Sequence, residues 1–129
     1  MLFQIRDDDP RVIERLEDLL QSMAAEVGAQ GRCHVAVERL RTGAPAMMDA
    51  TFQQTIEAAS LAFAGGRSIR MPSGAGHDAQ VLATIMPAGM LFVPSIGGIS
   101  HHWSENTGDA DIVTGAQVFV ETCRRLLTE

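Results

Sequence analysis

The sequence predicts an α/β chain built of two small lobes. Two hydrophobicity patterns and one turn-rich boundary indicate this class. Residues 2–6 and 33–40 alternate apolar and polar side chains, as half-buried strands do, with a helix-period apolar run between them. The run at 90–93 is continuously apolar, which is typical of a strand covered on both faces. A turn-rich stretch follows the second strand pattern, so we expect an α+β lobe over 1–44 and an α/β lobe over 45–129.

The first helix is predicted to begin at Pro10. Asp9 is a favoured N-cap residue, and proline is favoured at the first helical position. Apolar side chains recur at helical spacing as far as Val27, and Gly28 and Gly31 end the run. The first lobe is therefore predicted to be β-α-β, which buries too little apolar surface to be complete by itself.

Three further helices are predicted in the second lobe. Asp49 is the expected N-cap for the first of them, which should end at Gly65. A second, shorter helix is expected over 78–86, followed by the strand at 90–93. The last should start at about Asp109 and pack through an apolar stripe formed by Ile112, Val113, Ala116, Phe119, Val120, Cys123, Leu126 and Leu127.

Composition excludes some classes of function. The 129 residues include 10 Lys and Arg against 16 Asp and Glu, a formal charge of -6, without a basic cluster, so neither nucleic acid nor an anionic membrane is an expected partner. Prolines and glycines break the uncharged stretch 80–100, which we interpret as buried core. Cys33 and Cys123 form no CxxC motif and are expected to be reduced, buried packing residues of a cytoplasmic protein.

The glycine-rich stretch 73–79 is the first candidate site. Gly74, Gly76 and Ala79 match the G-x-G-x-x-G/A dinucleotide pattern, but neither a buried strand before it nor an acidic residue about twenty positions later supports that fold. Alternatively, the glycines let the backbone approach a small ligand at a helix N-terminus, with His77 as donor or acid/base group. His77 as a hydrogen-bonded turn residue is the competing interpretation.

The loop after the apolar run is the second candidate site. A histidine with a carboxylate four positions later, as in His101 and Glu105, can form a metal ligand and its supporting acceptor. One or two histidines cannot complete a metal site, and His102 and Trp103 are expected at the rim or in packing. Arg6, at the end of the first strand pattern, is by local sequence alone a surface arginine.

Three segments in this order resemble the C-terminal part of the amidase/carbamoylase group of the binuclear metal aminoacylase and carboxypeptidase superfamily. These segments are 73–79, 87–95, and 98–101 with Glu105. The group includes N-carbamoyl-L-amino acid hydrolases, ureidopropionases and allantoate amidohydrolases. The resemblance implies half of a ferredoxin-like lid domain over 1–44, followed by the C-terminal portion of a metallopeptidase-like catalytic domain.

The resemblance also implies residue roles. His101 corresponds to a metal ligand, with Glu105 behind it. His77 corresponds to the histidine that contacts the substrate at the scissile group, beside Gly76. Arg6 corresponds to the arginine that grips the substrate carboxylate, a task suited to a guanidinium fork.

The implied activity is metal-dependent hydrolysis of linear C–N bonds in carbamoyl or ureido amino acids. Two divalent ions, zinc, manganese or cobalt, would activate water in the intact enzyme. The other ligands and the general base belong to an N-terminal catalytic portion outside this sequence, so we expect no turnover by the chain alone, and relatives suggest a homo-oligomer. The alternative is a non-catalytic fragment or subunit that associates with a partner chain through unpaired sheet edges.

Overall fold

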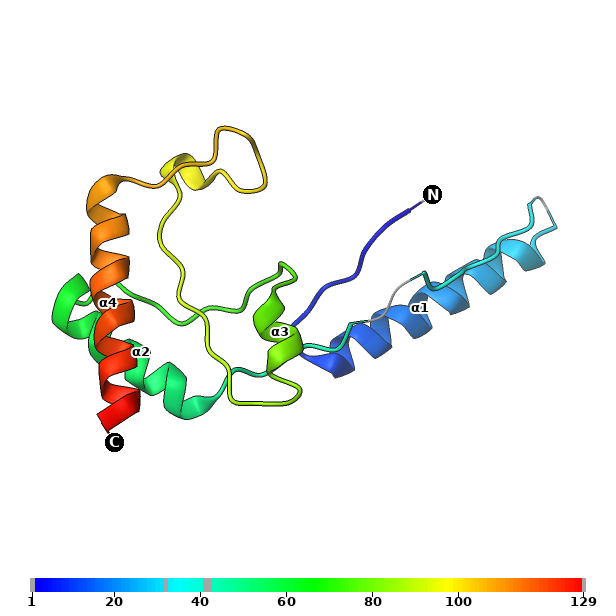
Figure 1. Cartoon of the computed structure of the whole chain (residues 1–129). Helices are drawn as coiled ribbons and strands as arrows, with labels where there is room; N and C mark the ends of the chain where they lie inside the picture. Colours follow the sequence, from blue (N-terminus) through cyan, green and yellow to red (C-terminus); the bar gives the residue numbers. More distant parts are fainter. Residues whose placement is uncertain (1, 32, 41–42, 129) are drawn as a thin grey trace. The chain divides into compact units, whose positions relative to one another are not determined.

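The computed structural model describes residues 2–31, 33–40 and 43–128, and the chain divides into two compact units. The first unit comprises Met1–Ala46 and Pro72–Gly76, and the second comprises Met47–Met71 and His77–Glu129. The expected lobe boundary at residue 44 stays a prediction. The regular elements among the described residues are α1 (Pro10–Ala29), α2 (Ala50–Ala64), α3 (Asp78–Leu82), the 3-10 turn η1 (Ile96–Gly98) and α4 (Asp109–Thr128) (Figure 1).

The first unit consists of α1 and extended chain. Asp9 caps α1 as predicted, because its carboxylate accepts a hydrogen bond of 2.9 Å from the backbone N–H of Arg11. Residues 33–40 then run back along α1 (Figure 1), and an ion pair joins Arg39 to Glu17 of the helix. No described residue of this unit is buried.

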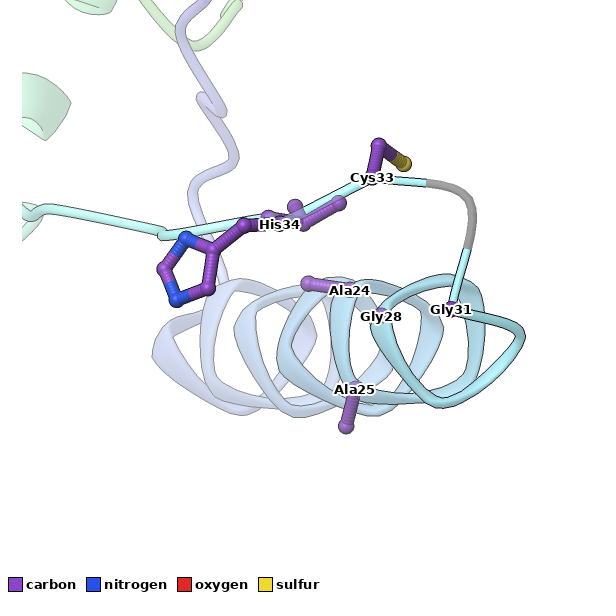
Figure 2. Close-up of a pocket in the computed structure, with 7 residues that line it drawn as sticks. Ala24, Ala25, Gly28, Gly31, Cys33 and His34 are labelled. Carbon is purple, nitrogen blue, oxygen red and sulfur yellow. The ribbon is translucent and has the colours of Figure 1, made fainter.

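A shallow hollow lies between the end of α1 and the extended chain that follows it. In Figure 2, Ala24 points toward this chain and Ala25 points away from it. Cys33 and His34 line the hollow, and Cys33 is exposed, so its predicted burial was wrong. A segment covered only by one helix on one side leaves its other side in water, which explains the exposure.

The second unit is built on the packing of α2 against α4 (Figure 1). Asp49 caps α2 as predicted, accepting a 2.9 Å hydrogen bond from Phe52 N–H, and Gly65 ends the helix at φ 57°. A left-handed φ of this kind favours glycine because it carries no Cβ. The buried residues of this unit come from the two helices and the chain beside them: Thr55, Ala59, Ser60, Ala88, Val118 and Thr122.

An extended segment, residues 88–93, crosses both helices. Ala88 C=O accepts a 2.8 Å hydrogen bond from Asp49 N–H at the start of α2. At Gly89 a Cβ would lie 3.1 Å from the Cβ of Phe52, so a side chain there would crowd α2. Val93 packs against Gly115 of α4 at the other end.

The predicted strands are not formed in the described part of the chain. Residues 2–6, 33–40 and 90–93 are extended but unpaired, so the predicted α/β class is not seen there. A strand needs a neighbour to satisfy its backbone hydrogen bonds, whereas a helix satisfies its own. The predicted helix over 78–86 is also shorter, since α3 ends at Leu82. Phe92 and Val93 are 51% and 40% exposed, so the interpretation of this stretch as buried core was wrong as well.

The last helix begins at Asp109 as predicted, but its predicted packing face was wrong. Val118 and Thr122 are the buried residues of α4, which packs against α2. Cys123 is only half-buried. The large side chains of the predicted stripe are mostly exposed, namely Ile112, Val113, Phe119, Val120 and Leu127.

No helix in the described part of the chain is both long and apolar enough to cross a membrane.

Candidate functional site

Arg6 and the glycine-rich loop come together in the first unit. Arg6 Nη1 donates to the backbone carbonyl of Gly74, and Nη2 donates to Gln4 Oε1 at 2.7 Å. A guanidinium has five N–H donors, so three remain for another acceptor. The side chain is exposed. The structure thus holds one predicted substrate-binding residue against the loop that contains another, Gly76.

The loop itself is shaped by short-range contacts. Ser73 Oγ accepts a 3.3 Å hydrogen bond from Ala75 N–H, and Gly74 and Gly76 have open space where a Cβ would stand. The open space beside both glycines leaves room for a small molecule, while the carbonyl of Gly74 is already bound by Arg6. His77 follows as the N-cap residue of α3, without a capping hydrogen bond from its side chain.

His77 lies beside Phe92 within the second unit. The two ring centroids are 5.2 Å apart at an interplanar angle of 61°, an edge-to-face contact. This contact fixes the imidazole against the extended segment while leaving it half-exposed. The sequence does not indicate Phe92 as a site residue, because the apolar run predicts a buried strand there. Only its position near the end of that predicted strand could have pointed to the site.

The loop from Ser95 to Thr107 is closed at its base. Ile96 N–H donates to Asn106 C=O at 2.8 Å, and Ser95 Oγ donates to Ile99 C=O. Gly97 adopts φ 68° within η1, a turn that favours glycine. A closed base holds the histidine-containing tip as a defined loop.

His101 and Glu105 meet at this tip. Glu105 Oε2 accepts a 2.7 Å hydrogen bond from the backbone N–H of His101. His101 has φ 56°, an uncommon conformation for a residue with a Cβ. Its imidazole is exposed and makes no hydrogen bond or ion pair within the described residues. The carboxylate therefore holds the main chain at His101 while the ring stays available.

The neighbouring histidine is engaged instead. His102 Nδ1 lies 2.8 Å from Ser104 Oγ, and its ring centroid lies 5.5 Å from that of Trp103. Trp103 is 91% exposed. Among the described residues, the ring of His101 thus has no partner, whereas the ring of His102 has two.

The described residues do not form a complete metal site. No three or more His, Cys, Asp or Glu side chains among them gather closely enough to hold an ion. A catalytic zinc-type site needs about three protein ligands, and a binuclear site needs more. The donor set of the described residues therefore does not fit a metal pair by itself.

Comparison with known proteins identifies the family. Peptidase family M20/M25/M40 matches residues 6–125, so the chain belongs to this family. Relatives include the N-carbamoyl-L-amino acid amidohydrolase of Geobacillus stearothermophilus, which is 30% identical over 97% of this chain. The allantoate amidohydrolase of Bacillus subtilis is 30% identical over 95% of it. The family resemblance inferred from the motifs is confirmed.

A solved structure supports the same relationship. An amidase of the hydantoinase/carbamoylase family from Burkholderia phymatum superimposes with a TM-score of 0.77 and 36% identity over 93% of this chain. That match covers 28% of the amidase, and the two relatives above are covered over 30% and 29% of their lengths. The chain is thus homologous to C–N hydrolases and spans less than a third of them.

Proposed function

We propose that this chain forms the C-terminal part of a metal-dependent amidohydrolase that cleaves linear C–N bonds of N-carbamoyl amino acids or related amides. The observation that carries the proposal is His101, whose imidazole is exposed at the tip of a closed loop and has no partner among the described residues. A histidine held in this way is suited to complete a site with donors from elsewhere. The relatives, an N-carbamoyl-L-amino acid amidohydrolase and an allantoate amidohydrolase, supply the reaction class.

His101 is proposed as one metal ligand, and Glu105 as its positioning residue. The carboxylate acts through the backbone N–H of His101. That contact holds the backbone of His101, whereas the usual supporting partner of a metal-binding histidine takes the second ring N–H. The remaining ligands must come from the part of the family's length that this chain does not span.

The other proposed residues handle the substrate. The three free donors of Arg6 suit a bidentate grip on the substrate carboxylate. Open backbone at Gly76 accommodates the ureido group. The half-exposed ring of His77 would donate a hydrogen bond to the carbonyl oxygen as charge develops on it, which stabilises the transition state.

Assembly with the missing portion tests this function. The chain should be co-expressed with the unmatched part of the Burkholderia phymatum amidase and assayed with an N-carbamoyl-L-amino acid, ureidopropionate and allantoate. We expect turnover of one of them by the assembled protein, and none by this chain alone. Absence of hydrolysis in a stable, metal-loaded assembly would contradict the proposal.

Metal content provides a second readout. Elemental analysis after dialysis should find weak, substoichiometric metal in the purified chain, because one imidazole cannot retain a metal pair. A tightly held pair of ions per chain would show that the ligand set lies within this sequence.

A further inference from the structure

Most of the large apolar side chains of α4 are exposed, and its buried residues are smaller or polar. The helix packs on α2, and its two buried residues are Val118 and the polar Thr122. The rest of the helix surface carries larger apolar side chains in water. The exposed fractions are 50% for Ile112, 57% for Val113, 61% for Phe119, 66% for Val120 and 86% for Leu127. We call these five residues the outer face of α4.

The outer face continues onto the extended segment Met90–Val93. Val93 contacts α4 at Gly115, and Gly115 is three residues from Ile112 and four from Phe119, so the three are neighbours on the helix surface. Val93 itself is 40% exposed, and Phe92 is 51% exposed. A contiguous exposed apolar surface of this kind marks an interaction site.

The segment also offers an unpaired strand edge. Backbone groups of Met90–Val93 make no hydrogen bond within the described part of the chain. The residues are extended and uniformly apolar, as in strands buried between two layers. Such an edge accepts a neighbouring strand through its free N–H and C=O groups.

We propose that the outer face of α4 and the edge of Met90–Val93 bind the portion of an M20 amidohydrolase that this chain does not span. The surface calls for a partner with an apolar sheet face and a free strand edge. The relatives' lengths supply that partner, because the matched region is only 28–30% of them. This inference rests on the proposed function, and it adds the surface through which the site is completed.

A second copy of this chain is the competing occupant. The net charge of -6 opposes self-association of so small a chain. A second copy would also bring the same incomplete donor set, so it would leave the metal site unexplained. Both points favour the missing portion.

The test is co-purification on a tagged partner. The full chain is co-expressed with the tagged unmatched portion of the Burkholderia phymatum amidase, and the recovered ratio is measured. We compare the wild type with Phe119→Glu and Val120→Glu, and use Gln117→Glu as control. Gln117 is an exposed polar residue of the same helix, so Gln117→Glu adds the same charge at a position that is not one of the five outer-face residues. Far-UV circular dichroism of each chain alone checks that α4 persists.

We expect an equimolar complex with the wild type and the control, and at least a tenfold loss of recovered chain with both outer-face variants. Failure of the wild type to bind or solubilise the tagged portion would overturn the proposal, as would equal recovery of all variants. Self-association of the wild-type chain, abolished by the outer-face variants, would assign the surface to a second copy.

Activity separates this inference from the proposed function. A stable complex that hydrolyses none of the three substrates leaves the binding surface standing and contradicts the function. A complex with His101→Ala that forms normally but has lost its activity supports both.

Discussion

Val93 lies directly against Gly115 of α4, where a Cβ on residue 115 would collide with the Cγ1 methyl of Val93. Gly115 is in an ordinary helical conformation, so backbone geometry does not require a glycine here. The close contact with Val93 does. The contact sets the position of the extended segment on α4. It also explains why a glycine occurs within a helix that otherwise lacks one.

The first prediction concerns this contact. Gly→Ala in a helix interior normally stabilises by about 1 kcal/mol. Here we expect Gly115→Ala to destabilise the chain by about 1–3 kcal/mol, because the added methyl overpacks the contact with Val93. Urea unfolding followed by circular dichroism measures the difference. Val93→Ala in the same chain should relieve most of the loss, and an increase in stability for Gly115→Ala alone would contradict the contact.

The second prediction concerns the start of α2. Asp49 caps the helix, and its own N–H donates to Ala88, so it links the helix to the extended segment. Asp49→Ala should lower the free energy of unfolding by about 1 kcal/mol through loss of the cap. Asp49→Asn keeps a capping oxygen and should cost far less. Equal losses in the two variants would show that the cap is unimportant.

The third prediction concerns pH. Hydrogen bonds from Arg124, and secondarily Arg125, lower the pKa of Glu121 from 4.5 to about 2. A lowered pKa in the folded state means that Glu121 stabilises the fold above pH 4.5, and that this contribution is lost as the pH falls toward about 2. The stability difference between wild type and Glu121→Gln, measured by urea unfolding across this range, should therefore shrink with acid. A constant difference would refute the ion pairs, as would a carboxyl titration by NMR at the ordinary pKa.

The fourth prediction concerns Glu105 in the assembled enzyme. Glu105→Ala removes the acceptor for the backbone N–H of His101, which should lower metal affinity about 10–100-fold, as loss of a supporting partner commonly does. Glu105→Gln retains an amide oxygen and should restore much of the affinity. Metal titration gives the readout, and the His101 amide chemical shift reports the lost hydrogen bond. Unchanged affinity with a shifted amide would remove Glu105 from the site.

The helices could be predicted from sequence because their signals are local. Asp9 and Asp49 cap α1 and α2, and Gly65 ends α2, in each case through contacts within a few residues. Strands at 33–40 and 90–93 could not be verified in the same way, since strand pairing needs neighbours that the described chain does not supply. The apolar periodicity of α4 was real, but it did not identify which surface would cover it.

The candidate site shows the same division between local and distant contacts. His101 and Glu105 could be paired from their spacing, although the carboxylate contacts the backbone of His101 and not its ring. The contact of Arg6 with Gly74 joins residues 68 positions apart, which no local pattern indicates. The roles of Arg6, Gly76, His77, His101 and Glu105 in catalysis stay predictions.

The central claim is that His101 is a metal ligand. The most direct test compares the metal content and hydrolysis rate of the assembled enzyme carrying His101→Ala with those of the enzyme carrying His102→Ala. The two histidines are adjacent, but within the part of the chain that the structure describes the ring of His101 has no partner, while that of His102 contacts Ser104 and Trp103. We expect His101→Ala to lose bound metal and at least about a hundredfold in kcat/KM, and His102→Ala to keep its metal. Full metal content and an unchanged rate in His101→Ala would contradict the account.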